Sequence, residues 1–200
     1  MLAAPRLIVF TDTQRADPEL MLARFAELAR RAHAGSVLFT LRDYALSMRA
    51  RWLLGERLAL LAQAAGQRLG VADRADLARA LGCSAFHLPE AGLTAQDARH
   101  YLGSEVFLTR ACHDAGSAAE AGLNARVLSP IFGARKGRPA AGLAALQSAA
   151  GRGACFALGA VGAGNAAACL AAGASGVAVI GAALAADPAP LLGALGILRV

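Results

Sequence analysis

Short apolar runs alternate with helix-like segments along the chain, and this alternation limits the fold more than any other feature. The apolar runs have the length and character of buried strands and lie at residues 7–10, 36–41, 69–72, 85–88, 106–111, 126–129, 155–158 and 176–180. Helical patterns follow them at residues 18–29, 49–65, 75–81, 94–101, 115–121 and 141–150, and from Asn165 and Pro188 onward. Such alternation predicts a parallel sheet covered by helices.

Two glycine turns near the C-terminus favour a closed barrel over an open sheet. The seventh run ends in Gly-Ala-Val-Gly and the eighth in Gly-Ala-Ala. In a (β/α)8 barrel the loops after these two strands are the usual phosphate cradle, because small residues let backbone N–H groups approach an anion. The predicted phosphate-binding residues are Gly159, Ala160, Gly162, Gly181 and Ala182. Because alanine is strained at positive φ, we expect the cradle to persist only if Ala160 keeps φ below zero.

We therefore predict an α/β fold consisting of a single, compact (β/α)8 TIM barrel domain over residues 1–200. The chain is at the small end of the size range for such barrels, so its loops are expected to be short. The longest expected loop follows the sixth strand, at residues 133–139.

Composition narrows the class of protein further. Hydrophobic residues make up 56% of the chain and charged residues 17%, which argues against disorder. No apolar stretch has suitable length and flanks for a membrane span, and the N-terminal segment is too short for a signal peptide. We therefore expect no membrane partner and a cytoplasmic location. None of the four cysteines has C-x-x-C spacing, so we expect small buried thiols rather than a zinc or redox site.

The net charge of +6 is consistent with anionic ligands. The arginines are scattered and aromatic residues make up only 5% of the chain, so we expect no nucleic-acid partner. No interface pattern stands out, and the sequence leaves self-association open.

Polar side chains at the ends of the predicted strands are rich in cations and poor in carboxylates. Strand ends are where a barrel carries its functional groups. The set comprises Thr11, Asp12, Thr40, Arg42, Asp73, Arg74, His87, Glu90, Arg110, His113, Ser129, Arg135, Lys136 and Arg138. This balance of charge indicates a phosphorylated substrate.

Seven segments, in this order, carry a resemblance to a known family. They lie at residues 7–12, 41–42, 71–78, 85–89, 129–132, 157–165 and 174–179. Among them are a strand ending in Thr-Asp, an Asp-Arg-Ala-Asp segment and a Ser-Pro-Ile-Phe segment. Together they resemble the family of thiamin phosphate synthases and their relatives, the thiazole tautomerases. The resemblance covers nearly the whole chain.

Several positions depart from the synthase pattern. The resemblance implies that a synthase binds a pyrimidine pyrophosphate and magnesium, with a glutamine and a lysine after the second strand and a metal-binding aspartate after the fourth. Thr40 and Tyr44 stand at the glutamine and lysine positions, and residues 90–92 read Glu-Ala-Gly. Ala72 replaces an asparagine, and residues 134–138 replace a Thr-x-Thr-Lys loop.

The tautomerase branch fits these local sequences better. It has Leu-Pro after the fourth strand, as this chain does at residues 88–89, and an arginine and a histidine after the fifth, matched by Arg110 and His113. The resemblance implies proton transfer on a carboxythiazole phosphate, which makes the ring aromatic and needs neither metal nor cofactor. Imidazole suits this step because its pKa lies near neutral pH.

The main prediction is thus a thiazole tautomerase, an isomerase of thiamin biosynthesis whose partner is a small phosphorylated thiazole. His113 is the predicted catalytic base. The predicted substrate-binding residues are Arg42, Asp73, His87, Arg110 and Lys136. Strand alternation places Arg110 and His113 on opposite faces if the segment stays extended, so both face the site only if the strand turns near Cys112.

Two alternatives remain open. The chain could be a thiamin phosphate synthase, a transferase that couples hydroxymethylpyrimidine pyrophosphate to thiazole phosphate, and magnesium is expected only in that case. It could also be a non-catalytic relative that binds a phosphorylated thiazole.

Overall fold

Eight parallel strands close into a barrel in which each strand pairs with the next and β8 pairs with β1. This computed structural model describes residues 4–116, 120–135 and 137–199. The strands are β1 Leu7–Phe10, β2 Val37–Leu41, β3 Arg68–Ala72, β4 Ala85–Leu88, β5 Phe107–Cys112, β6 Ala125–Leu128, β7 Cys155–Leu158 and β8 Gly176–Val179. This is the α/β TIM barrel that the alternation predicts.

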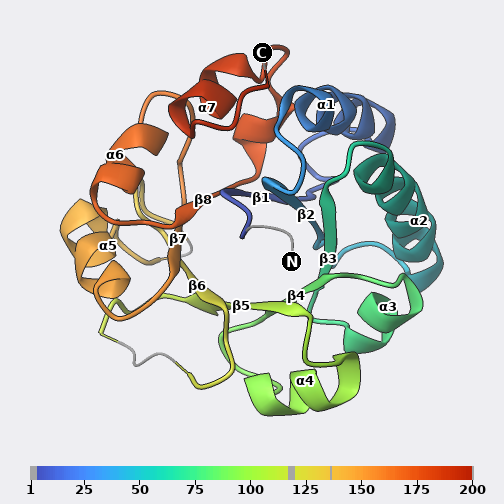
Figure 1. The fold of residues 1–200 in the computed structure, drawn as a ribbon, viewed down its shortest axis with the longest axis horizontal. Helices are drawn as coiled ribbons and strands as arrows, with labels where there is room; N and C mark the ends of the chain where they lie inside the picture. The colour runs from blue at the N-terminus through green and yellow to red at the C-terminus, as the bar shows by residue number, and fades with distance from the viewer. Residues whose placement is uncertain (1–3, 117–119, 136, 200) are drawn as a thin grey trace.

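Helices form a ring outside the strands (Figure 1). They are α1 Pro18–Arg31, α2 Met48–Ala64, α3 Ala75–Ala80, α4 Ala95–Leu102, α5 Gly142–Ala150, α6 Ala166–Ala171 and α7 Ala189–Ala194, with a 3-10 turn, η1, at Gly181–Leu184. Local sequence explains where several begin. Asp17 caps α1, which has Pro18 at its first position, and Thr94 forms a capping box with Asp97 at α4.

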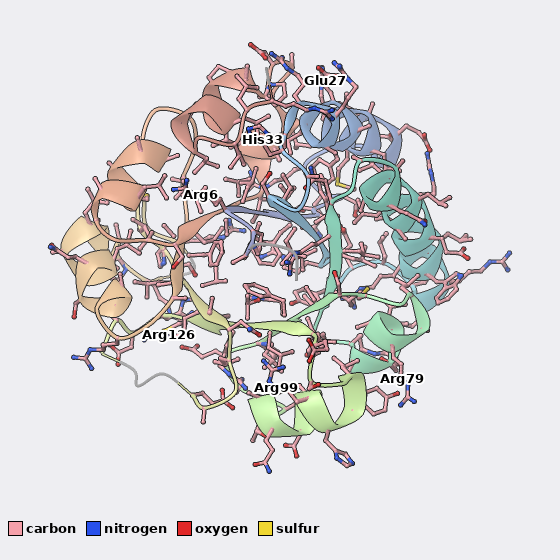
Figure 2. The ribbon with its side chains drawn as sticks, in the orientation of Figure 1. Arg6, Glu27, His33, Arg79, Arg99 and Arg126 are labelled. Atoms are coloured by element: carbon pink, nitrogen blue, oxygen red, sulfur yellow. The ribbon has the colours of Figure 1, made fainter. Side chains whose placement is uncertain are left out.

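The apolar core has two parts because strand residues alternate between the two faces of the sheet. One part fills the barrel and consists of Ile8, Phe10, Leu38, Ala85, Ala125, Val127, Phe156, Ala178 and Ile180. The other part lies between strands and helices and includes Val9, Phe25 and Phe39. Charged side chains such as Glu27 and Arg79 lie at the outer rim (Figure 2). This alternation decides which strand-end residues point to the barrel axis.

One predicted helix is not found in the described residues of its range. The sequence pattern predicts a helix over residues 115–121, but Ala115 and Gly116 form a turn, and Glu120 and Ala121 are not helical. Residues 117–119 lie outside the described part of the chain. The alanines of this segment give it helix propensity, but Gly116 lowers that propensity, and the segment has little apolar surface to bury against the barrel. Within the described residues, no helix combines the length and hydropathy needed to cross a membrane.

Candidate active site

Two adjoining cavities open at the carboxyl ends of the strands, where barrels place their sites. The central cavity has a volume of about 560 Å³, and its walls include Phe10, Asp12, Arg42, Asp43, His87, Glu90, His113, Ser129 and Arg138. The cradle cavity has a volume of about 570 Å³, and its walls include Arg15, Phe132, Ala160, Val161, Gly181 and Ala182. The two share Arg135, Leu158, Gly159 and Ile180, so ligands in them would lie side by side.

His113 lies in the central cavity because it follows β5 with the same alternation as Thr109 and Ala111. Its Nδ1 is 2.6 Å from the carbonyl oxygen of Ser129. Since a carbonyl only accepts hydrogen bonds, Nδ1 carries the proton and Nε2 holds the free lone pair of the neutral ring. Nε2 lies 3.8 Å from the Glu90 carboxylate. His113 is therefore oriented with a basic nitrogen toward the cavity.

Arg110 lies on the opposite face of β5, as the alternation predicts. Its Nε donates to Glu120 at 2.6 Å, and its other nitrogens donate to the carbonyl oxygens of Pro89 at 2.8 Å and Leu93 at 2.6 Å. It is not among the residues that line either cavity. The side chain holds the loop after β4 against the segment before β6, and the structure does not bring it to the predicted substrate site.

Arg42 enters the central cavity from the end of β2. Its guanidinium lies over the Phe10 ring, 5.2 Å from the ring centre, and its backbone N–H donates to Thr11 Oγ1 at 2.8 Å. Within the described part of the chain it forms no ion pair. Burial is the largest effect that lowers the pKa of Arg42, and the nearby charge of Arg135 lowers it further. A half-buried guanidinium without a carboxylate partner is suited to an anionic ligand.

His87 is buried at the base of the central cavity. Its Nδ1 lies 2.9 Å from Thr109 Oγ1, and its ring meets Phe10 edge to face with centres 4.9 Å apart. Burial, with smaller effects from Arg42 and Arg110, lowers its pKa to about 3. The imidazole is therefore neutral at physiological pH and adds no charge to the cavity.

The predicted substrate residue Asp73 is not brought into either cavity. Asp73 follows β3 with φ of 69°, is exposed, and does not line either cavity. Its backbone N–H donates to the His87 carbonyl at 3.1 Å. Aspartate tolerates this left-handed backbone better than most residues. Lys136 lies outside the described residues.

The glycine turn after β7 is built around Asn165. The Asn165 side chain accepts from the Gly162 N–H at 2.9 Å and donates to the Ala160 carbonyl at 3.0 Å. Gly162 therefore has its N–H already bonded and does not line the cradle cavity, unlike Gly159 and Ala160. Ala160 has φ of 51°, so the negative φ on which we expected the phosphate cradle to depend is not present. The two Asn165 bonds hold the turn despite the strained alanine.

Close packing explains why the turn begins with glycine. Gly159 has φ of 109°, and a Cβ there would lie 2.8 Å from Pro130 Cα. The turn after β8 supplies Gly181 and Ala182 to the opposite wall of the cradle cavity. Four of the five predicted phosphate-binding residues thus line one cavity. The fifth, Gly162, donates its N–H to Asn165 and so helps to hold the turn.

Arg15 is a cavity residue that sequence reasoning missed. It lies in the loop between β1 and α1, lines the cradle cavity, and its Nε is 3.1 Å from Asp12 Oδ2. Its Nη1 would be 3.6 Å from a Cβ placed on Gly181. The usable signal was its position, five residues after the end of β1, on a loop that starts at the mouth of the barrel.

The carboxylates at this end of the barrel decide whether the magnesium ion that the synthase alternative implies has ligands here. Mg²⁺ is bound through one or two carboxylates together with substrate phosphates. Asp12 is paired with Arg15. Asp43 lines the central cavity, and its Oδ1 accepts from the Thr13 N–H and hydroxyl, at 2.5 and 2.7 Å. Its Oδ2 is buried and has no hydrogen-bond partner among the described residues.

The remaining carboxylates are less suited to the ion. Glu90 Oε2 lies 3.5 Å from Arg138 and 3.8 Å from His113, so a cation and an imidazole already surround it. Asp73 stands outside both cavities. Across residues 4–116, 120–135 and 137–199, no cluster of three or more histidine, cysteine, aspartate or glutamate side chains could hold a metal. Asp43 is therefore the carboxylate that would hold Mg²⁺ here, together with substrate phosphates rather than with further protein ligands.

Comparison with known proteins identifies the group to which the chain is similar. A family model described as thiamine monophosphate synthase matches residues 7–183. A thiamine-phosphate synthase of Mycolicibacterium paratuberculosis is 34% identical over 164 residues, covering 74% of this chain and 71% of the relative. A thiamine-phosphate synthase of Thermus thermophilus is 35% identical over 137 residues, covering 66% of each protein.

Solved structures show the same fold. The thiamine phosphate pyrophosphorylase of Pyrococcus furiosus superposes with a TM-score of 0.78 at 23% identity, covering 96% of this chain and 93% of that protein. A thiamine phosphate pyrophosphorylase of Bacteroides thetaiotaomicron superposes with a TM-score of 0.60 at 15% identity, covering 95% and 93%.

Proposed function

This chain belongs to the thiamine monophosphate synthase family, and we propose that it is a transferase that forms thiamin phosphate from a pyrimidine pyrophosphate and a thiazole phosphate. In this reaction the thiazole nitrogen attacks the methylene carbon of the pyrimidine. A C–N bond forms while the C–O bond to pyrophosphate breaks, and pyrophosphate leaves with the bonding electrons. The thiazole ring becomes positively charged, and no proton has to be removed.

The predicted isomerase activity, that of a thiazole tautomerase, is wrong. The curated relatives with substantial coverage are thiamine-phosphate synthases. That prediction relied on the loss of a glutamine and a lysine after β2, at Thr40 and Tyr44. Arg15, Arg135 and Arg138 line the two cavities from other loops, and a comparison limited to the positions after β2 does not include them.

The observation that carries the proposal is the pair of adjoining cavities. A tautomerase handles one phosphorylated molecule, whereas the transferase must hold two anionic molecules in contact. The cradle cavity has the small residues and the arginine suited to a single phosphate, at Gly159, Gly181 and Arg15. The central cavity has the apolar floor of Phe10 and the cations suited to a ring that carries a diphosphate. The shared wall supports the proposal, because two molecules that react must be held next to each other.

His113 takes a different role in this reaction from the predicted one. Coupling removes no proton, so a general base is not required. The Nε2 atom of His113 faces the central cavity with its ring fixed by Ser129, and we assign it to orienting a substrate ring. Loss of an orienting contact should lower kcat/KM by about tenfold, whereas loss of a general base costs ~10²–10⁴-fold.

The test is formation of thiamin phosphate from the two purified substrates, followed by chromatography in the presence of Mg²⁺. Wild type, His113→Ala and the surface variant Arg79→Gln are compared, and circular dichroism checks folding. We expect turnover by wild type, about tenfold less by His113→Ala, and no change in Arg79→Gln.

Two outcomes would contradict the proposal. Binding of thiazole phosphate without any thiamin phosphate would indicate a non-catalytic binding protein. A fall of more than ~10³-fold in His113→Ala would make this histidine an acid or base and would require a different chemical step.

A further inference from the structure

Exposed apolar side chains gather on the outer face of helices α1 and α2, which lie side by side in the helix ring (Figure 1). Seven large apolar side chains are exposed among the described residues, and four of them belong to these two helices: Leu20, Met48, Leu53 and Leu60. Leu60 is the most exposed of the seven, at 67%. Scattered leucines are common on protein surfaces, whereas several on one face indicate a contact surface.

A groove with a volume of about 490 Å³ lies beside Leu60, between the two helices. Small side chains make it hollow, since Ala26 and Ala29 line it from α1 and Ala64 lines it from α2. Leu60 does not line the groove itself. Helical spacing places it next to Arg57 and Ala64, which do. This face therefore carries a projecting leucine next to a hollow lined by alanines.

The charges on this face are also complementary to each other. The rim of the groove is basic and contains three arginines: Arg30, Arg57 and Arg199. Arg199 forms no ion pair with any residue that the structure describes. Glu56 is exposed and likewise has no cationic partner in residues 4–116, 120–135 and 137–199. It precedes Leu60 by one helical turn, so the acidic group and the leucine project from the same side of α2.

We propose that this face binds a second copy of the chain across a two-fold axis, so that Leu60 of each copy enters the groove of the other. A two-fold contact needs a surface that is complementary to itself, and this face carries both the projecting group and the hollow. A second copy fits better than an unrelated acidic partner, because one chain supplies both halves of the contact.

An antiparallel arrangement of the two α2 helices satisfies the charges. Glu56 of one copy then lies toward the C-terminal ends of α1 and α2 of the other copy. Arg199 stands there, because its N–H donates to the carbonyl oxygen of Arg31, the last residue of α1, at 2.7 Å. The apolar groups thus meet at the centre of the contact and the opposite charges meet at its edge, as in most protein interfaces.

The contact is separate from the candidate active site. No residue that lines the groove lines the central cavity or the cradle cavity. Both cavities therefore stay open in the dimer. The inference does not depend on the proposed transferase function, and its test measures mass rather than turnover.

The test is sedimentation equilibrium of the full chain from about 1 to 200 μM, a range that reveals micromolar dissociation constants. We expect the average mass to rise with concentration toward twice that of one chain. Leu60→Glu should weaken association by at least about tenfold, because a charge replaces the apolar centre of the contact. Ala26→Gln is the second variant, since it fills the hollow from α1 and should weaken association similarly.

Leu93→Glu is the matched control, because Leu93 is an exposed leucine outside α1 and α2, and this variant should associate like wild type. Circular dichroism checks that all three variants fold. A wild type that stays monomeric at the highest concentration would overturn the proposal. Association of Leu60→Glu and Ala26→Gln with the affinity of wild type would also overturn it, because the contact would then lie on another face.

A charge exchange tests the antiparallel arrangement. Glu56→Arg and Arg199→Glu each create like charges at the edge, so each should weaken association by about threefold. Combining the two changes restores opposite charges and should return the affinity to within about twofold of wild type. A double variant that associates more weakly than either single variant would overturn the antiparallel contact.

Discussion

At the residue scale, the buried imidazole of His87 makes the stability of the protein depend on pH. Its pKa is lowered to about 3 by burial first, and then by the charges of Arg42 and Arg110. In the unfolded chain the pKa is near 6.5, so unfolding takes up a proton at any pH between these values. This contribution to stability is fully present above pH 6.5 and is lost as the pH falls toward 3.

We therefore expect the His87 site to lower the free energy of unfolding by about 2 kcal/mol as the pH falls from 7 to 5. Urea denaturation of wild type and His87→Gln at both pH values isolates this contribution, because the other titrations are common to both proteins. The variant should lose about 2 kcal/mol less than wild type over this interval. Equal losses in the two proteins would mean that His87 is protonated as readily in the folded state as in the unfolded state.

Ala160 leads to a second prediction at this scale. A left-handed alanine costs the folded state about 1–2 kcal/mol, which glycine removes. Glycine also stabilises the unfolded chain through its greater conformational entropy, by about 0.4–1 kcal/mol, which opposes this gain. Because φ is 51° there, Ala160→Gly should raise the unfolding free energy by about 0.5–1 kcal/mol with the cradle intact. Thermal or urea denaturation measures the change. Alanine-to-glycine at Ala168, inside α6, is the control and should destabilise by about 1 kcal/mol.

Side-chain direction decided which site residues the sequence could predict. Alternation along β5 predicts that Arg110 and His113 lie on opposite faces, and the structure has His113 in the central cavity and Arg110 bonded to Glu120. The partner of Arg110 was not predictable, because Glu120 lies on an irregular segment. Arg15 was missed for the same reason, since loops carry no periodicity that fixes where a side chain points.

At the scale of elements, strands were predicted more accurately than the connections between them. The predicted runs 7–10, 85–88 and 155–158 coincide with β1, β4 and β7. Buried parallel strands are continuous apolar runs, so their first and last residues can be located in the sequence. The connection from β5 to β6 gave the wrong prediction, because alanine and glycine content alone does not supply the apolar face that a short helix needs.

The cradle shows how one element can keep its shape when its sequence changes. Alanine at the second glycine position should disfavour the turn after β7, yet Asn165 bonds both the Gly162 N–H and the Ala160 carbonyl. Asn165 is also the N-cap residue of α6. The side chain that holds the turn therefore stands at the start of the helix. A position-by-position comparison with glycine-containing relatives does not reveal this compensation.

At the scale of the whole molecule, the barrel depends on closure between its last strand and its first. The backbone of β8 passes very close to the start of β1, where the Val177 N–H donates to the Arg6 carbonyl at 3.0 Å. A Cβ on Gly176 would lie 2.3 Å from the Arg6 carbonyl oxygen and 2.6 Å from a ring carbon of Phe156. Adding a methyl group there must push apart the two strands that complete the circle.

Gly176→Ala should therefore lower the unfolding free energy by about 2–3 kcal/mol, the upper end for an overpacked core. The matched control is Gly193→Ala in α7, where a Cβ would meet nothing within 4 Å. That change should raise stability by about 0.5–1 kcal/mol, because alanine favours the helix. Urea denaturation of both variants measures the difference. Because both gain the same methyl group and lose the same backbone freedom, opposite signs attribute the cost at Gly176 to the closing seam, whereas equal changes would mean that the seam tolerates the extra volume.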